Sequence, residues 1–235
     1  MKKDNFLKGA FVATLCIIIT KILGVIYVIP FYSIVGTHGS VLYGSAYNIY
    51  AIFLNLSTMG LPLAISKMVS EYNTLDYQYL KKKAYKLAGR FMIITSIITS
   101  IILLIISPFL AQNIIKVNDS VGQHMMIGAL GYCAGESISG TIMVGGITTV
   151  MRVSASAIII VTLISMIRGY LQGLKYITAS SVSQVIEQFV RVAVIIIGSY
   201  LCVKVIKVPL SISISVAVFG ATAGAFVAYI YLLYK

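Results

Sequence analysis

Long apolar stretches dominate this chain and restrict it to a membrane fold. A transmembrane helix needs about 20 mostly apolar residues to cross the hydrocarbon layer. Only 10% of the residues are charged, against about 25% in a typical soluble domain. So few charges cannot cover the surface of a soluble protein of this size. The spans that we expect are residues 9–35, 41–69, 90–107, 153–168, 179–203 and 210–234.

These spans are predicted to be helices rather than strands of a barrel. Strands of a membrane barrel alternate between apolar and polar positions, whereas residues 101–106 and 158–161 are apolar at every position. A helix also satisfies its own backbone hydrogen bonds, which lipid cannot do. We therefore expect an all-α integral membrane protein with about six transmembrane helices, in which residues 1–235 form one membrane domain.

The distribution of lysine and arginine predicts the orientation. The chain has 18 Lys and Arg against 6 Asp and Glu, a net charge of +12. Basic residues concentrate in cytoplasmic loops of membrane proteins. With the N-terminus in the cytoplasm, 12 basic residues fall inside and 4 outside, and the other two lie within spans. This predicts a multi-pass protein of the cell membrane and explains the excess charge without nucleic acid as a partner.

Residues 121–150 are apolar enough to suggest a further span but are rich in glycine. An additional span would place Arg168 and Lys175 outside and spoil the charge distribution. We interpret the segment as a glycine-rich outer loop, and a re-entrant course for it stays open. Pairs of glycines four residues apart allow close helix packing; they are Gly131/Gly135, Gly169/Gly173 and Gly220/Gly224.

Lys21 is the charged residue with the clearest functional hypothesis. It lies about 18 Å into the first predicted span, at about 1.5 Å rise per residue, which is too deep for its ammonium group to reach the interface easily. A charge at such depth usually marks a functional site. We expect Lys21 to face a water-filled or anionic site, and an ion pair with a carboxylate that serves only structure is the alternative.

Glu187 and Arg191 lie four residues apart in the fifth predicted span and therefore share a helix face. Gln184 and Gln188 extend this polar face. One interpretation is a self-neutralised pair that only permits insertion into the membrane. The other is a pair that lines a cavity and interacts with Lys21 or with substrate.

Proline and glycine predict breaks in the first two spans. Gly60 and Pro62 interrupt the second span and Pro30 lies near the outer end of the first, because proline removes a helix hydrogen bond. Broken helices often flank the substrate sites of transporters. Asn48 and Asn55 add polar side chains to the second span and are further candidates for cavity residues.

Two groups of motifs resemble a known family. The first opens with Thr20-Lys21-Ile22-Leu23-Gly24 and continues with Gly60-Leu61-Pro62-Leu63-Ala64-Ile65-Ser66-Lys67. The second is Arg168-Gly169-Tyr170-Leu171-Gln172-Gly173 followed by Ser183-Gln184-Val185-Ile186-Glu187-Gln188-Phe189-Val190-Arg191. These motifs resemble the polysaccharide biosynthesis and MurJ-type lipid II flippases, with the stage V sporulation protein B branch nearest.

The resemblance implies one lobe of a two-lobed flippase fold. It covers nearly the whole chain but only the family's N-terminal half, so the expected partners include a missing C-terminal lobe or a second copy. The implied substrate is a polyprenyl-diphosphate-linked sugar, a lipid II-like precursor of the cell wall or of a polysaccharide. Lys21 and Arg191 would attract its phosphates, and membrane lipids would surround its tail.

Two alternatives to a flippase stay open. One is a cation-coupled multidrug exporter of the same superfamily, and the other is a truncated membrane protein that transports nothing. The sequence contains no phosphate loop, nucleophile elbow or metal-ligand cluster, so we expect no enzyme, no cofactor and no metal. Cys16, Cys133 and Cys202 lie in apolar stretches without paired spacing, which predicts packing roles.

Overall fold

The computed structural model describes residues 6–58, 60–121, 140–206 and 208–234, and they are helical almost throughout. No strand occurs among these residues, which confirms the all-α prediction. The helices are α1 (Phe6–Ile26), α2 (Val28–Thr58), α3 (Leu61–Thr74), α4 (Gln78–Val121), α5 (Gly140–Gly173), α6 (Ile177–Tyr200), the π-helix η1 (Leu201–Ile206) and α7 (Leu210–Tyr234).

Six stretches in the described part of the chain are long and apolar enough to cross a membrane. They are Gly9–Gly36, Gly39–Thr74, Gln78–Asn113, Gly145–Gly173, Ile177–Ile206 and Leu210–Tyr234. The first two stretches do not coincide with single helices. The first joins α1 to the start of α2, and the second joins the rest of α2 to α3. The number of spans is therefore the predicted one, although helix breaks fall inside them.

The breaks follow from glycine and proline. Gly36 has φ 74° and separates the two halves of α2, so the chain reverses direction between the first and second spans. Gly60 has φ 68°, which L-residues with side chains rarely adopt, and it precedes Pro62 in the first turn of α3. Pro30 cannot donate a hydrogen bond to the carbonyl of Ile26, where α1 ends.

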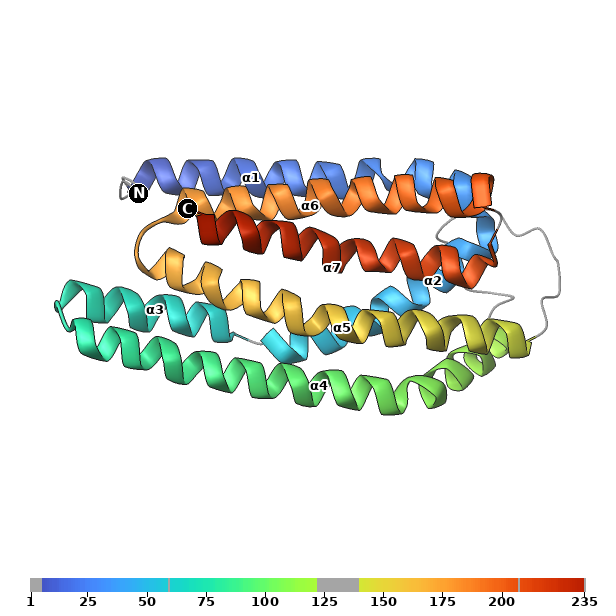
Figure 1. Ribbon diagram of the computed structural model, residues 1–235, viewed down its shortest axis with the longest axis horizontal. Helices are drawn as coiled ribbons and strands as arrows, with labels where there is room; N and C mark the ends of the chain where they lie inside the picture. Colours follow the sequence, from blue (N-terminus) through green and yellow to red (C-terminus); the bar gives the residue numbers. More distant parts are fainter. Residues whose placement is uncertain (1–5, 59, 122–139, 207, 235) are drawn as a thin grey trace.

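The helices form an elongated bundle in which α5 and α7 occupy the centre (Figure 1). On one side α7 packs against α6, and α6 packs against α1; on the other, α5 packs against α3 and α4. Half of the most apolar window of the α5 and α7 spans is buried, against 6% for the first span. The first span is therefore the least buried of the six and contacts the rest of the bundle mainly through α6.

Two of the predicted glycine pairs lie at close helix contacts. A Cβ on Gly169 would lie 2.6 Å from the Pro62 carbonyl oxygen, and one on Gly173 would lie 2.7 Å from that of Ser66, so α3 rests directly on α5. Gly224 approaches the Glu187 carbonyl in the same way, which brings α7 against α6. These pairs serve packing, as their spacing predicts. Gly131 and Gly135 lie outside the described residues.

The helices are longer than the predicted spans at two places. Residues 70–89, expected to be a polar connection, form the end of α3, a short turn and the start of α4. Residues 140–150, expected in the outer loop, form the first turns of α5, while residues 122–139 lie outside the described part. Polar surface does not end a helix that continues beyond the hydrocarbon layer, so hydropathy alone underestimates its length.

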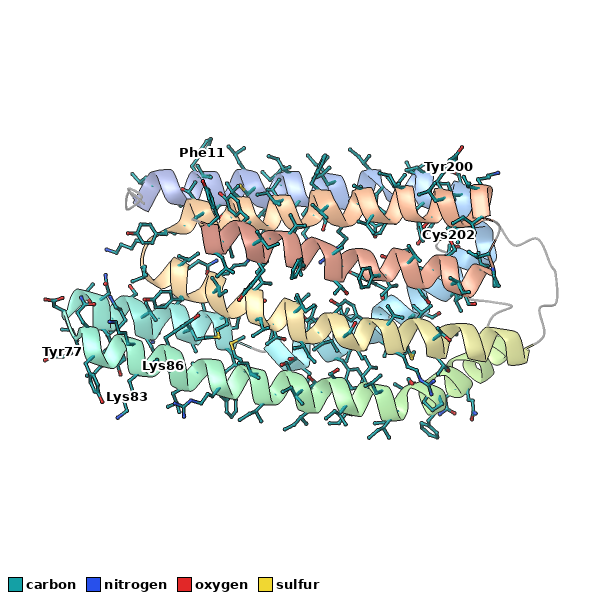
Figure 2. The ribbon with its side chains drawn as sticks, viewed as in Figure 1. Phe11, Tyr77, Lys83, Lys86, Tyr200 and Cys202 are labelled. Carbon is teal, nitrogen blue, oxygen red and sulfur yellow. The ribbon has the colours of Figure 1, made fainter. Side chains whose placement is uncertain are left out.

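Both termini lie at one end of the bundle, which we call the basic end (Figure 1). It holds the α3–α4 and α5–α6 turns, and Figure 2 shows Lys83 and Lys86 there, on the outer side of α4. Tyr200 and Cys202 lie at the opposite end (Figure 2). Exposed basic side chains at the basic end are Lys67, Lys82, Lys83, Lys86 and Lys175.

Candidate functional site

A buried carboxylate that bridges two arginines forms the charged centre of the bundle. Glu187 on α6 has a side chain only 10% exposed. Its Oε1 lies 2.5 Å from Nη2 of Arg191, one helical turn further along α6. Its Oε2 lies 2.8 Å from Nη2 of Arg168 on α5. We call Arg168, Glu187 and Arg191 the charged triad; it ties the fourth span to the fifth.

Arg168 is the member that was not among the predicted site residues. The prediction ended the fourth span at Arg168 and counted its charge on the cytoplasmic side, whereas α5 continues to Gly173 and the side chain packs against α6. Its Nε donates a hydrogen bond of 2.8 Å to Ser183 Oγ on α6. Ser183 in turn donates to the Ser180 carbonyl at 2.6 Å, so the guanidinium is anchored at two points of α6.

Helix register explains how Arg168 reaches α6. Only a short turn separates α5 from α6, so the two helices run antiparallel and meet near this turn, while α7 packs against both of them further along. Counting outward from this turn, Arg168 stands opposite residues near Ser183. Its long side chain then reaches Glu187, one turn beyond. Gln172 makes a similar cross-connection nearer the turn, where its Nε2 donates to Ser180 Oγ at 3.0 Å.

The charged triad keeps a net positive charge, because one carboxylate faces two guanidinium groups. Arg191 is only 20% exposed. Its Nε is buried and has no hydrogen-bond partner within the described residues, and the same holds for the hydroxyl of Tyr50 on α2. Arg191 lies near Tyr43, Tyr47 and Tyr50. The rings of Tyr43 and Tyr47 stack with centroids 5.6 Å apart, and those of Tyr47 and Tyr50 are tilted with centroids 5.8 Å apart.

Lys21 differs from the charged triad in its surroundings. It lies on the exposed surface of α1 and forms no ion pair in the part of the chain that the structure describes. Its helix nevertheless runs beside the triad, because α1 packs along α6. A Cβ on Gly24 would lie 3.6 Å from Nε2 of Gln188, the residue next to Glu187.

The other predicted site residues are spread over two helices. Asn48 and Asn55 are exposed on one face of α2, and neither forms a hydrogen bond with another described residue. Gln184 is half-buried on α6, one turn before the triad glutamate. By contrast, Ser57 on α2 is fully buried and pairs with Thr162 on α5 at 3.1 Å, which assigns it to helix packing.

The chemistry available to this arrangement is the attraction of anions. Over residues 6–58, 60–121, 140–206 and 208–234, no group of three His, Cys, Asp or Glu side chains comes together to hold a metal ion. Cys16 and Cys202 are buried free thiols. The features that could act on a ligand are the positive triad, the tyrosine hydroxyls beside Arg191, and the ammonium group of Lys21.

Comparisons with known proteins found related sequences. The chain is 34% identical over 232 residues to the lipid II flippase MurJ of Bacillus subtilis (strain 168), which covers 97% of the chain and 39% of the relative. It is 29% identical to the uncharacterized membrane protein YabM of the same organism, over 99% of the chain and 37% of the relative. It is 25% identical to stage V sporulation protein B, also of that organism, over 83% of the chain and 32% of the relative.

The chain spans well under half the length of these relatives, and no solved structure gives a significant match. The sequence model of the family described as "Polysaccharide biosynthesis protein" matches residues 6–235, which is nearly the entire chain. The chain therefore belongs to the polysaccharide biosynthesis protein family.

Proposed function

We propose that this chain takes part in moving a polyprenyl-diphosphate-linked sugar across the cytoplasmic membrane by alternating access, and that its N-terminus is cytoplasmic. Family membership and the similarity to a lipid II flippase support the substrate class. Six apolar stretches support a multi-pass membrane protein. The concentration of exposed lysines at the basic end supports the orientation, because positive loops stay inside.

The physical task is to carry a charged headgroup through hydrocarbon. Moving an ionised group from water into an apolar medium costs tens of kcal/mol in the idealised case, so a diphosphate needs fixed cations that replace its hydration. The polyprenyl tail has no such problem and can remain in the bilayer. A flippase therefore needs positive charge at the depth of the membrane centre, on a surface that a large lipid can reach.

The observation that carries the proposal is the ammonium group of Lys21, which forms no ion pair with any residue that the structure describes. It lies about 22 Å along α1 at about 1.5 Å rise per residue, on an exposed surface. The nearest conceivable structural partner, Glu187, is already bound to two arginines. A structural ion pair between Lys21 and that carboxylate is thus disfavoured, and an anion supplied by substrate becomes the better partner.

We assign further roles in binding the headgroup to the remaining candidate residues. Arg191 lies at nearly the same depth on the neighbouring helix and keeps an unused Nε donor. We assign phosphate attraction to Lys21 and Arg191, and the positioning of Arg191 to Glu187. Gln184, Asn48 and Asn55 supply hydrogen-bonding groups for the sugar and phosphates.

Alternating access requires a second body against which this bundle can rock. We propose a C-terminal lobe or a second copy of the chain in that role, facing the poorly buried first span. The break at Gly60 and Pro62 separates α2 from α3 and provides a hinge. A gradient of ions or the membrane potential would drive the cycle, since one charge that crosses 100 mV gains about 2.3 kcal/mol.

The test is complementation of a flippase-deficient strain by the chain together with any continuation of its reading frame. We expect Lys21→Ala to abolish growth at unchanged protein abundance, and Lys21→Arg to restore part of it. Lys82→Ala, which removes an exposed charge at the basic end, should grow normally. Normal growth of Lys21→Ala would show that transport does not need Lys21, and the proposal would lose its physical support.

A cell-free assay with labelled lipid-linked precursors separates the alternatives. The positive charged triad disfavours cationic drugs, so a drug exporter would transport cationic dyes and leave the precursors untouched. A non-transporting fragment would move neither substrate. The DNA downstream of Lys235 bears on this second case, because a second lobe in another reading frame would indicate a broken gene.

A further inference from the structure

A groove between α3 and α4 at the basic end lies apart from the proposed transport site. It has a volume of about 630 Å³ and is lined mainly by apolar side chains, including Met68 and Tyr72 from α3 and Leu87 and Phe91 from α4. Lys83 is the charged residue in its lining. Leu87 and Phe91 are 66% and 57% exposed, so the groove is open to the surroundings of the bundle.

The depth of the groove follows from the charges on α4. Residues 91–111 contain no charge, and this run is about 31 Å long, close to the thickness of the hydrocarbon layer. Arg90 therefore marks the boundary of the hydrocarbon. Lys83 lies about 10 Å beyond it, and its flexible side chain brings the ammonium group among the lipid phosphates. The groove thus extends from the headgroup layer to the first carbons of the acyl chains.

The charge around the groove selects one kind of occupant. Lys83 lies 5.9 Å from the centre of the Tyr79 ring and pairs with no carboxylate in the described parts of the chain. Arg90, two turns along α4, shares its side of the helix, because seven residues bring a helix back to nearly the same direction. Lys81 is different: it is buried, and its Nζ donates to Asn73 Oδ1 at 3.2 Å, which joins α4 to α3.

We propose that this groove binds one anionic phospholipid, with its phosphate at Lys83 and the upper part of an acyl chain against Leu87 and Phe91. A zwitterionic headgroup would place its own ammonium beside Lys83 and Arg90, neither of which pairs with a described carboxylate, and this repulsion disfavours it. Basic pockets between transmembrane helices on the cytoplasmic side bind anionic headgroups by the same physics. The site is independent of the transport function proposed above.

The chain contains no tryptophan, so a single introduced tryptophan reports lipid contact without background. Phe91→Trp places the reporter in the groove. Phe11→Trp is the matched control, since Phe11 is 65% exposed and lies at the basic end on α1, outside the groove (Figure 2). Each variant is placed in two kinds of nanodisc. One contains brominated phosphatidylglycerol as the minor lipid in unlabelled phosphatidylcholine. The other contains brominated phosphatidylcholine as the minor lipid in unlabelled phosphatidylglycerol.

We expect brominated phosphatidylglycerol to quench the Phe91→Trp reporter with about fivefold greater apparent affinity than brominated phosphatidylcholine, the preference that one basic residue near a membrane surface provides. The Phe11→Trp reporter should not distinguish the lipids. In the Phe91→Trp variant, the additional substitution Lys83→Ala should remove the preference for phosphatidylglycerol. The substitution Lys82→Ala, on another side of α4, should retain it.

Three results would overturn the proposal. Equal quenching of Phe91→Trp by both lipids would mean ordinary bulk lipid contact. Equal losses from Lys83→Ala and Lys82→Ala would mean diffuse attraction to the lysine cluster. Displacement of the brominated lipid by an equal amount of polyprenyl phosphate would mean that the groove prefers a different occupant.

Discussion

Lys21 and Arg191 are two basic residues at nearly the same depth in neighbouring helices, yet their surroundings differ completely. Each lies about 21–22 Å from the start of its helix. Arg191 is mostly buried and bound to Glu187, which also binds Arg168. Lys21 is exposed on a span whose apolar window is only 6% buried. The depth of a charge along its helix therefore does not determine what neutralises it, because the counter-charge depends on the neighbouring helices.

The difference lies in how the charge of each residue is compensated. Arg191 meets its counter-charge within the chain, and the desolvation of the arginines is offset by close contacts and by the anchoring of Arg168 to Ser183. Lys21 has no such compensation in the described structure, so its counter-charge must come from outside these helices. Three variants test this contrast, and they follow in order of the size of their expected effect on stability.

Glu187→Ala should have the largest effect. It leaves two guanidinium groups close together and unpaired in the bundle, and breaking a buried pair in this way costs about 3–5 kcal/mol. Thermal unfolding of the purified chain in detergent measures the loss. Glu71→Ala is the matched control, because Glu71 is exposed and forms no ion pair with a described residue. If both variants unfold alike, the triad does not stabilise the bundle.

Gly169→Ala should have an intermediate effect. The new Cβ would lie 2.6 Å from the Pro62 carbonyl oxygen, so α3 must move away from α5. Overpacking of this kind costs about 1–3 kcal/mol. Gly145→Ala serves as the comparison, since nothing lies within 4 Å of the Cβ position there. Equal unfolding temperatures for the two variants would contradict direct contact between α3 and α5.

Lys21→Ala should have the smallest effect on stability, within about 0.5 kcal/mol, as expected for an exposed side chain without partners. The same thermal unfolding assay measures it. Together with loss of transport, this outcome would separate Lys21 from the structural charges of the triad. A loss of stability comparable to that of Glu187→Ala would instead identify Lys21 as part of a structural ion pair, and Lys21 and Arg191 would then not differ in this respect.

Part of the candidate site could be predicted from local spacing. Glu187 and Arg191 are four residues apart, and helix geometry alone makes them neighbours. Arg168 could not be assigned in this way, because its contact with Glu187 depends on the length of α5 and on the register of the α5–α6 pair. The short connection after Gly173 could have indicated this contact, because it makes α5 and α6 antiparallel and brings Arg168 opposite Ser183.

The sequence alone predicts the all-α class, the number of spans, and the helix breaks at Pro30, Gly60 and Pro62. These depend on quantities that each segment carries alone: the apolar length, the missing N–H of proline and the left-handed conformation open to glycine. The tertiary structure decided which charges are paired. A buried charge is stable only with a partner at about 3 Å, and whether that partner lies in another helix depends on how the helices pack.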